Sequence, residues 1–212
     1  MKEFLSPAHY IDSDHPAVVE FARRHAEGAN DLERAVSLYY AVRDGVRYNP
    51  FLDFSRESAF QGSACLENGE GFCIGKAALL AACARAAGIA ARVGFADVKN
   101  HLTTPRLAER MGTDLFVYHG FTELWLEGKW VKATPAFNLD LCRKFRVRPL
   151  EFDGRHDSIF HPFDADERRH MEYLRDRGSF ADVPVAEIQQ AFREYYPALY
   201  GLGKDAARET FA

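Results

Sequence analysis

The chain has 212 residues, of which 47% are hydrophobic, 13% aromatic and 27% charged, and its net charge is −4. This composition is typical of a globular protein, and the length suffices for one domain with a substantial core. Nucleic acids and anionic membranes require clustered lysine and arginine, so the mild acidity and the lack of a long basic run argue against both as partners. We therefore expect a single domain over residues 1–212.

Residues 1–14 contain no apolar stretch of signal-peptide length, and no run of about 18 apolar residues occurs, so a cytoplasmic location is expected. The cysteines would be reduced in that compartment. Their spacing matches no zinc pattern, and we expect neither a metal nor a cofactor. A redox pair between Cys65 and Cys73 is an alternative. Nothing in the sequence specifies an oligomeric state.

The first elements in the chain are two helices expected within residues 14–43. Pro16 lies in the first turn of one helix, and apolar residues at three- and four-residue spacing mark a buried face of the other. Both helices are expected to serve packing. An irregular stretch follows over residues 46–68, where Tyr48 and Gln61 are candidate hydrogen-bond donors to a site. The alternative is that both are ordinary loop residues.

A cysteine stands where this stretch turns into the central helix, which is predicted from Cys73 to Ala87 and closed by Gly88. The helix carries so little charge that it must be buried almost all round. Free N–H groups and the positive end of the helix dipole favour a thiolate at this position, which makes Cys73 a candidate nucleophile. The alternative is a small apolar filler. Lys76 would lower the thiol pKa or, alternatively, reach solvent.

A strand over residues 89–98 follows, and then a polar segment over residues 99–114 with a short helix at 106–110 that would cover a cleft. The clearest hairpin comes next. Its strands are residues 116–126 and 129–134, joined by the turn residues 127–128.

The hairpin register decides which side chains become neighbours. If Glu127 and Gly128 form the turn, Phe121 lies opposite Thr134, and Thr134 lies diagonally beside His119 on the same face. A one-residue slip would move Thr134 to the other face. Among the eight histidines, His119 is therefore the best partner for the thiol, with His101 in the polar segment as the main rival.

The remainder is expected to be a helical extension over about residues 150–212. Asp164 and Glu167 form a capping box for a helix ending near Gly178, and a second helix is expected from residue 183 to 196. A strand or two is expected near residues 145–152.

Several motifs in sequence order resemble the transglutaminase-like superfamily over about residues 35–137. They are Gly71-Phe72-Cys73 at the helix start, the turn at residues 84–93, the strand from His119 to Leu126, and the strand from Gly128 to Val131. The resemblance implies an α+β fold of bacterial stand-alone type. It has a papain-like core over about residues 35–140, in which a central cysteine-bearing helix packs on an antiparallel sheet, with extra helices at both ends.

The resemblance also implies roles for individual residues. Cys73 becomes the nucleophile, and His119 the base and proton donor. The family's aspartate position holds Thr134, followed by the matching Pro135. A threonine hydroxyl can hold the imidazole ring but cannot stabilise an imidazolium by charge. Asn138 and Asp140 are the other candidates for orienting the ring.

The implied activity is thiol-dependent acyl transfer or hydrolysis at an amide bond of a peptide or another amide-containing substrate. The N–H of Cys73 would meet the oxyanion, with a second donor from the preceding loop. Cleavage is favoured over crosslinking, because the chain lacks room for the extra domains and calcium sites of animal crosslinking enzymes. The alternative is a catalytically degenerate module that binds a peptide or protein partner, and the missing aspartate favours it. Glu123 is expected to be structural, and Trp125 and Trp130 to lie in the core.

Overall fold

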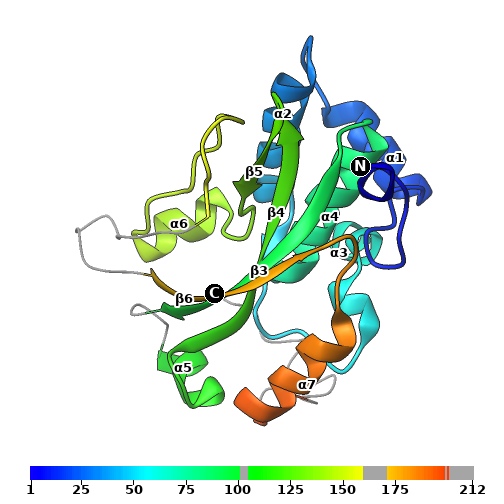
Figure 1. The fold of residues 1–212 in the computed structure, drawn as a ribbon. Helices are drawn as coiled ribbons and strands as arrows, with labels where there is room; N and C mark the ends of the chain where they lie inside the picture. Colours follow the sequence, from blue (N-terminus) through cyan, green and yellow to red (C-terminus); the bar gives the residue numbers. More distant parts are fainter. Residues whose placement is uncertain (101–104, 160–170, 199, 201–212) are drawn as a thin grey trace.

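The computed structural model describes residues 1–100, 105–159, 171–198 and 200 (Figure 1). Its helices are α1 (Pro16–His25), α2 (Asp31–Gly45), α3 (Gly62–Glu67), α4 (Cys73–Ala86), α5 (Pro105–Met111), α6 (Leu139–Phe145) and α7 (Val185–Tyr195), with 3-10 turns at Lys2–Phe4 and Glu57–Phe60. The strands are β1 (Arg47–Tyr48), β2 (Glu70–Gly71), β3 (Ala91–Asn100), β4 (Leu115–Leu126), β5 (Lys129–Ala133) and β6 (Met171–Phe180).

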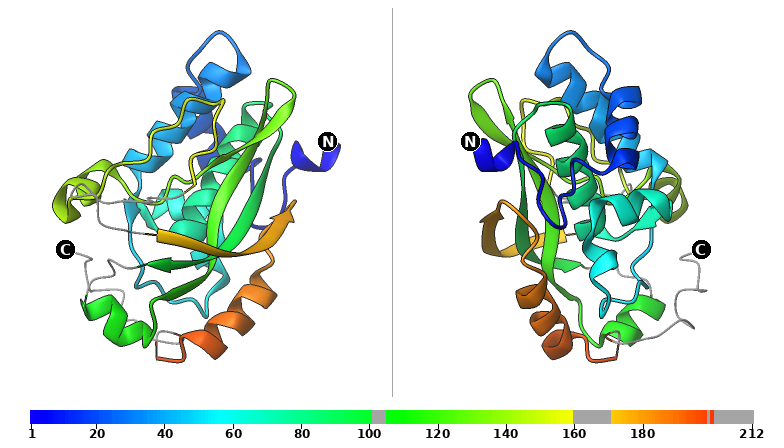
Figure 2. Two further views of the ribbon diagram at one scale, coloured as in Figure 1. Left: turned by 60° about the vertical axis from the view of Figure 1, so that its left-hand side comes forward. Right: turned by 90° about the vertical axis from the view of Figure 1, so that its right-hand side faces the viewer.

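The main sheet is antiparallel with the strand order β5-β4-β3-β6, and β1 and β2 form a separate parallel pair. Helix α4 runs along one face of the sheet, and α1 and α2 lie beyond it on the same side (Figures 1 and 2). Helices α5 and α7 lie together at one end of the molecule (Figure 2). The predicted α+β class, with a cysteine-bearing helix packed on an antiparallel sheet, is confirmed.

Helix α4 is surrounded by protein, as its lack of charge predicts. All residues from Cys73 to Arg85 are buried, and most of them are alanine or leucine. Small side chains allow the sheet on one side and α1, α2 and α3 on the other to approach the helix axis closely. Burial all round leaves the helix little freedom to shift, so the position of its first residue is well defined.

The hairpin has the predicted register. Leu126 pairs with Lys129 and Thr122 with Ala133. Both turn residues, Glu127 and Gly128, have positive φ values of 49° and 84°. Two residues with positive φ match the twist of a tight hairpin, which explains why this short signal fixed the register.

Two predictions for the C-terminal part are wrong. Met171–Phe180 is strand β6 rather than the end of a helix, because its backbone pairs antiparallel with the edge of β3. No strand forms in the described stretch at residues 145–152, where helix α6 ends at Phe145 instead. The predicted final helix is confirmed as α7. The capping box at Asp164 and Glu167 lies outside the described residues.

The two tryptophans are also placed differently from the prediction. Trp125 is 36% exposed, and the half-buried Trp130 ring carries the guanidinium of Arg92 at 4.2 Å from its centroid. Arg92 also pairs with the buried Glu123, which therefore has the expected structural role. Among the described residues, none belongs to a helix long and apolar enough to span a lipid bilayer.

Candidate active site

Cys73 is the first residue of α4 and is held there by a crowded loop. Strand β2, which ends two residues earlier, pairs with β1 so that Gly71 lies opposite Tyr48. A Cβ atom on Gly71 would lie 2.4 Å from the sulfur of Cys65, and one on Gly75 would lie 2.9 Å from the carbonyl oxygen of Ala59. The glycines on both sides of Cys73 thus let α3 and the preceding turn pack directly against the start of α4.

His119 is brought to the same place by strand β4. A Cβ atom on the neighbouring Gly120 would lie 3.0 Å from the Cα of Ile74, so strand and helix start are in close backbone contact. A bulge precedes the histidine, because one residue of β3, Asp97, stands opposite two residues of β4, and Tyr118 has a φ of 54°. Such bulges re-aim side chains near the end of a paired segment.

Cys73 and His119 line one cavity of about 50 Å³. Both side chains are buried, with 8% and 5% exposure. The rest of its described lining is mainly apolar. It comes from β1 and the loop after it, the residue before α4, helix α5, the start of β4 and the α7 region. These lining residues are Tyr48, Pro50, Phe54, Phe72, Leu107, Met111, Phe116, Val117, Phe192 and Tyr196. The loop and the short helix that were predicted to flank a cleft therefore do so, and α7 adds a wall that the sequence did not indicate.

Burial raises the pKa of the Cys73 thiol to about 11, while backbone N–H groups of Gly120, Ile74 and Cys73 itself act in the opposite direction. Strand β5 pairs with β4 only as far as Thr122, and the N–H of Gly120, two residues beyond that pair, is directed at the sulfur. The predicted favouring of the thiolate by the helix start is present, but burial outweighs it. Burial therefore favours the neutral thiol, while several N–H dipoles face the sulfur.

Lys76 does not reach solvent, and its ammonium hydrogen-bonds to backbone carbonyl groups rather than to the thiol of Cys73. Its side chain is fully buried, and its ammonium donates hydrogen bonds to the carbonyl oxygens of Arg43 (2.8 Å) and Val46 (2.6 Å) at the end of α2. Burial lowers its pKa to about 7. Lysine at a helix C-terminus satisfies carbonyl groups that have no helical partner, so Lys76 ties α4 to α2.

The candidates for orienting His119 differ in placement. The hydroxyl of Thr134 is buried and donates to the carbonyl oxygen of Ile159 at 3.2 Å. Asn138 precedes α6, and its side-chain oxygen accepts the N–H of Tyr48 at 3.2 Å. Asp140 is 89% exposed and pairs with Arg143 at 3.5 Å. The hairpin register puts Thr134 on the face that His119 occupies, whereas Asp140 points to solvent.

Two tyrosines stand beside the sulfur. Burial, followed by the negative charges that Cys73 and Tyr196 would carry, raises the pKa of Tyr48. The hydroxyl of Tyr196 accepts the N–H of Val117 at 2.5 Å and donates to the carbonyl oxygen of Leu115 at 2.8 Å. This contact fixes the residue after α7 to the beginning of β4. Tyr196 was not predicted as a site residue, because only the tertiary fold brings it near the cysteine.

The other loop candidate lies outside the cavity. Gln61 donates to the carbonyl oxygen of His9 at 3.5 Å on the protein surface. The rival base, His101, lies outside the described residues.

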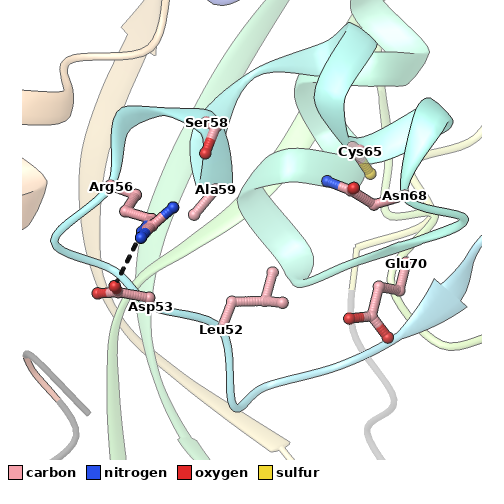
Figure 3. A pocket seen from close by; sticks show the side chains of 8 residues that line it. All are labelled: Leu52, Asp53, Arg56, Ser58, Ala59, Cys65, Asn68 and Glu70. Atoms are coloured by element: carbon pink, nitrogen blue, oxygen red, sulfur yellow. Dashed lines mark hydrogen bonds and ion pairs between the residues drawn. The ribbon is translucent and has the colours of Figure 1, made fainter. Parts of the chain in front are cut away.

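Cys65 opens onto a different pocket, which has a volume of about 280 Å³ and a partly polar lining (Figure 3). Asp53 and Arg56 form an ion pair of 3.2 Å at its edge, and Glu70 lines the opposite side (Figure 3). Burial raises the pKa of Cys65 to about 12. Cys65 and Cys73 are both free thiols that line different pockets, and the redox pair stays a prediction.

Among the described residues, no group of three or more histidine, cysteine, aspartate or glutamate side chains is arranged to hold a metal ion.

The fold and the site define a papain-like α+β protein with a cysteine at the start of a buried helix and a histidine on the adjoining sheet. The model of the transglutaminase-like superfamily matches residues 19–135, more than half of the chain, and the chain belongs to this superfamily.

One solved structure that resembles the chain is a crystal structure described as "a Putative Cysteine Protease from Cytophaga hutchinsonii". It has 18% sequence identity and a TM-score of 0.47, and the match covers 84% of this chain and 52% of that one. The chain thus spans about half the length of that structure. No curated protein matches the sequence.

Proposed function

We propose that this protein is a thiol-dependent enzyme that transfers or hydrolyses the acyl group of an amide bond in a peptide or other amide-containing substrate. The observation that carries the proposal is that Cys73 and His119, which are 46 positions apart in the sequence, line one cavity at the start of α4. A nucleophile and a base at one site are the minimum requirement for acyl transfer through a covalent intermediate.

The proposed reaction begins from a neutral thiol. As the sulfur of Cys73 attacks the carbonyl carbon, His119 takes the thiol proton, and it later gives that proton to the amine when the carbon–nitrogen bond breaks. Water or a second amine then attacks the thioester, and His119 carries the proton of this nucleophile back to the sulfur. Proton transfer during the attack suits a thiol whose pKa burial raises to about 11, since a preformed thiolate is then scarce.

Backbone N–H groups around the sulfur support the next step. The N–H groups of Cys73 and Ile74 at the start of α4 lie beside the reacting centre, where an oxyanion would form. We assign the second donor to the hydroxyl of Tyr48, which lines the cavity with Cys73 and comes from strand β1.

Thr134 is the proposed positioning residue for His119. Its hydroxyl hydrogen is committed to the carbonyl of Ile159, which leaves the oxygen lone pairs free to accept an imidazole N–H. This arrangement would fix the ring without adding a negative charge. It therefore differs from the family's aspartate in strength rather than in direction.

Alkylation of Cys73 by iodoacetamide across pH tests the proposal, with the modified residue identified by peptide mapping. Unaided, a thiol of pKa about 11 is only about one part in 10⁴ ionised at pH 7. We expect the native protein to react well below pH 8 and the His119→Ala variant to react only as the pH approaches 11. His156→Ala is the matched control, because that histidine is 84% exposed and pairs with Asp153. Equal profiles for native protein and His119→Ala would contradict the proposal.

The second candidate function is a catalytically degenerate module that binds a peptide or protein partner in the same groove. Two observations favour it, namely Thr134 at the family's aspartate position and the raised pKa of the Cys73 thiol. It predicts alkylation at the pH of a buried thiol and no effect of His119→Ala. The same experiment therefore separates the two functions.

A further inference from the structure

We propose that the acyl group accepted by Cys73 is small and apolar, with at most about three carbon atoms beyond the carbonyl. This inference rests on the proposed function, because it names the substrate class of the same site. Its basis is the size and the chemistry of the cavity, neither of which follows from the Cys73 and His119 pair.

The walls around the sulfur offer apolar contact on every described side. Phe54 and Phe72 come from the N-terminal side of α4, Leu107 and Met111 from α5, and Phe192 from α7. The aromatic members pack against one another, with ring centroids 4.9 Å apart for Phe54 and Phe72 and 5.2 Å apart for Phe54 and Phe192. A wall built from mutually packed rings keeps its shape, so the aromatic side of the cavity has a fixed position.

The volume of the cavity limits the part of the acyl group that its walls can enclose. An apolar cavity of about 150 Å³ accommodates benzene, which has six carbon atoms. The cavity at Cys73 measures about 50 Å³, one third of that volume, and therefore has room for about two carbon atoms, or three with slight adjustment of Met111.

The same walls disfavour a charged acyl group. The described residues of the lining include no aspartate, glutamate, lysine or arginine. A carboxylate or ammonium on the acyl group would lose its hydration without gaining a counter-charge from these residues, which is strongly unfavourable. The acyl donor is thus either a short aliphatic acid derivative or a peptide whose residue at the scissile bond carries a side chain of alanine size. Both present the same small apolar group.

A series of activated esters tests the inference on the whole protein. The probes are p-nitrophenyl acetate, propionate, hexanoate, octanoate and hemisuccinate, and acylation is followed by p-nitrophenolate release and by intact mass. Each rate is divided by the rate of the same ester with free cysteine, which removes intrinsic reactivity. We expect acetate and propionate to react at least about tenfold faster than octanoate or hemisuccinate, since overfilling a packed cavity or burying a charge costs at least that factor.

A matched pair of variants assigns the effect to the cavity. Met111→Ala enlarges it and should shift the optimum toward hexanoate, whereas Met171→Ala, at a similarly buried methionine on β6, should leave the order of esters unchanged. N-acetylalanine and N-acetylphenylalanine p-nitrophenyl esters compare the two sources. A higher corrected rate for the alanine ester than for acetate indicates that the natural acyl donor is a peptide. The reverse order indicates a free short acyl group. Both results support the inference.

The outcomes also separate this inference from the proposed function. Failure of every ester to acylate Cys73 would overturn the proposed function, and the inference with it. Acylation of Cys73 at equal corrected rates for acetate, octanoate and hemisuccinate would overturn the inference alone. An unchanged order of esters in Met111→Ala would likewise show that the cavity does not select the acyl group.

Discussion

Replacing Gly71 by alanine would drive a methyl group into the sulfur of Cys65. The new Cβ atom would lie 2.4 Å from that sulfur and 3.3 Å from the Cγ atom of Lys76. The first separation is more than 1 Å shorter than ordinary contact, and Cys65 is buried on α3. The clash falls two residues before Cys73, so it acts on the loop that leads into the start of α4.

The size of the effect follows from two opposing terms. Overpacking of a well-filled core costs about 1–3 kcal/mol. A Gly→Ala change at a permissible φ stabilises by about 0.4–1 kcal/mol through the unfolded chain, and Gly71 does not have a positive φ. We therefore expect Gly71→Ala to lower the free energy of unfolding by about 1–2 kcal/mol.

Removing the sulfur should relieve the clash. In the double variant with Cys65→Ala, the nearest remaining atom of residue 65 is its Cβ at 3.6 Å, an ordinary contact, and the new methyl fills the vacated space. Urea unfolding of the four proteins measures the coupling, which we expect at about 1–2 kcal/mol in favour of the double variant. Gly45→Ala is the steric control, because nothing lies within 4 Å of its Cβ position. Additivity within about 0.3 kcal/mol would refute this account of the loop.

Three further expectations concern the site and the core. Tyr196→Phe should lower the free energy of unfolding by about 1–3 kcal/mol in a thermal or urea titration, because the Leu115 carbonyl and the Val117 N–H each lose a partner, and no change would contradict the contact. Thr134→Val should slow acylation by about three- to tenfold at unchanged KM while Thr134→Ser retains the rate, and equal rates for both variants would remove Thr134 from the site. Burial raises the pKa of Cys83, so this thiol stays neutral in the fold but ionises in the unfolded chain above about pH 9. Stability should therefore fall as the pH rises above 9, and Cys83→Ala should make that fall shallower by up to about 1.4 kcal/mol per pH unit, whereas parallel curves would contradict the shift.

Local signals were sufficient to predict the helix that carries Cys73 and the strand that carries His119. The charge-poor run after Cys73 predicted a buried helix because no face of it is suited to water. The pair Glu127-Gly128 predicted the hairpin and its register, because few turns other than a tight hairpin place two successive residues at positive φ. That register also placed His119 and Thr134 on the same face of the hairpin.

The failures arise where non-local contacts decide the structure. Strand β6 shows no apolar alternation, since most of its side chains are exposed at the edge of the sheet, and only pairing with β3 makes it a strand. Lys76 looked like a surface residue because the two carbonyl groups that hold it belong to α2, 30 and more positions earlier. The raised pKa of Cys73 likewise depends on the surrounding protein that buries the sulfur.

The most direct test of Cys73 and His119 as a reactive pair is interception of the thioester. The protein is incubated with a library of short peptide amides and hydroxylamine, which captures an acyl group whether the natural acceptor is water or an amine, and hydroxamates are detected by mass spectrometry. We predict hydroxamates with the native protein, none with Cys73→Ala, and at least about a hundredfold fewer with His119→Ala. Hydroxamates that persist in Cys73→Ala, or an equal yield in His119→Ala, would contradict the account.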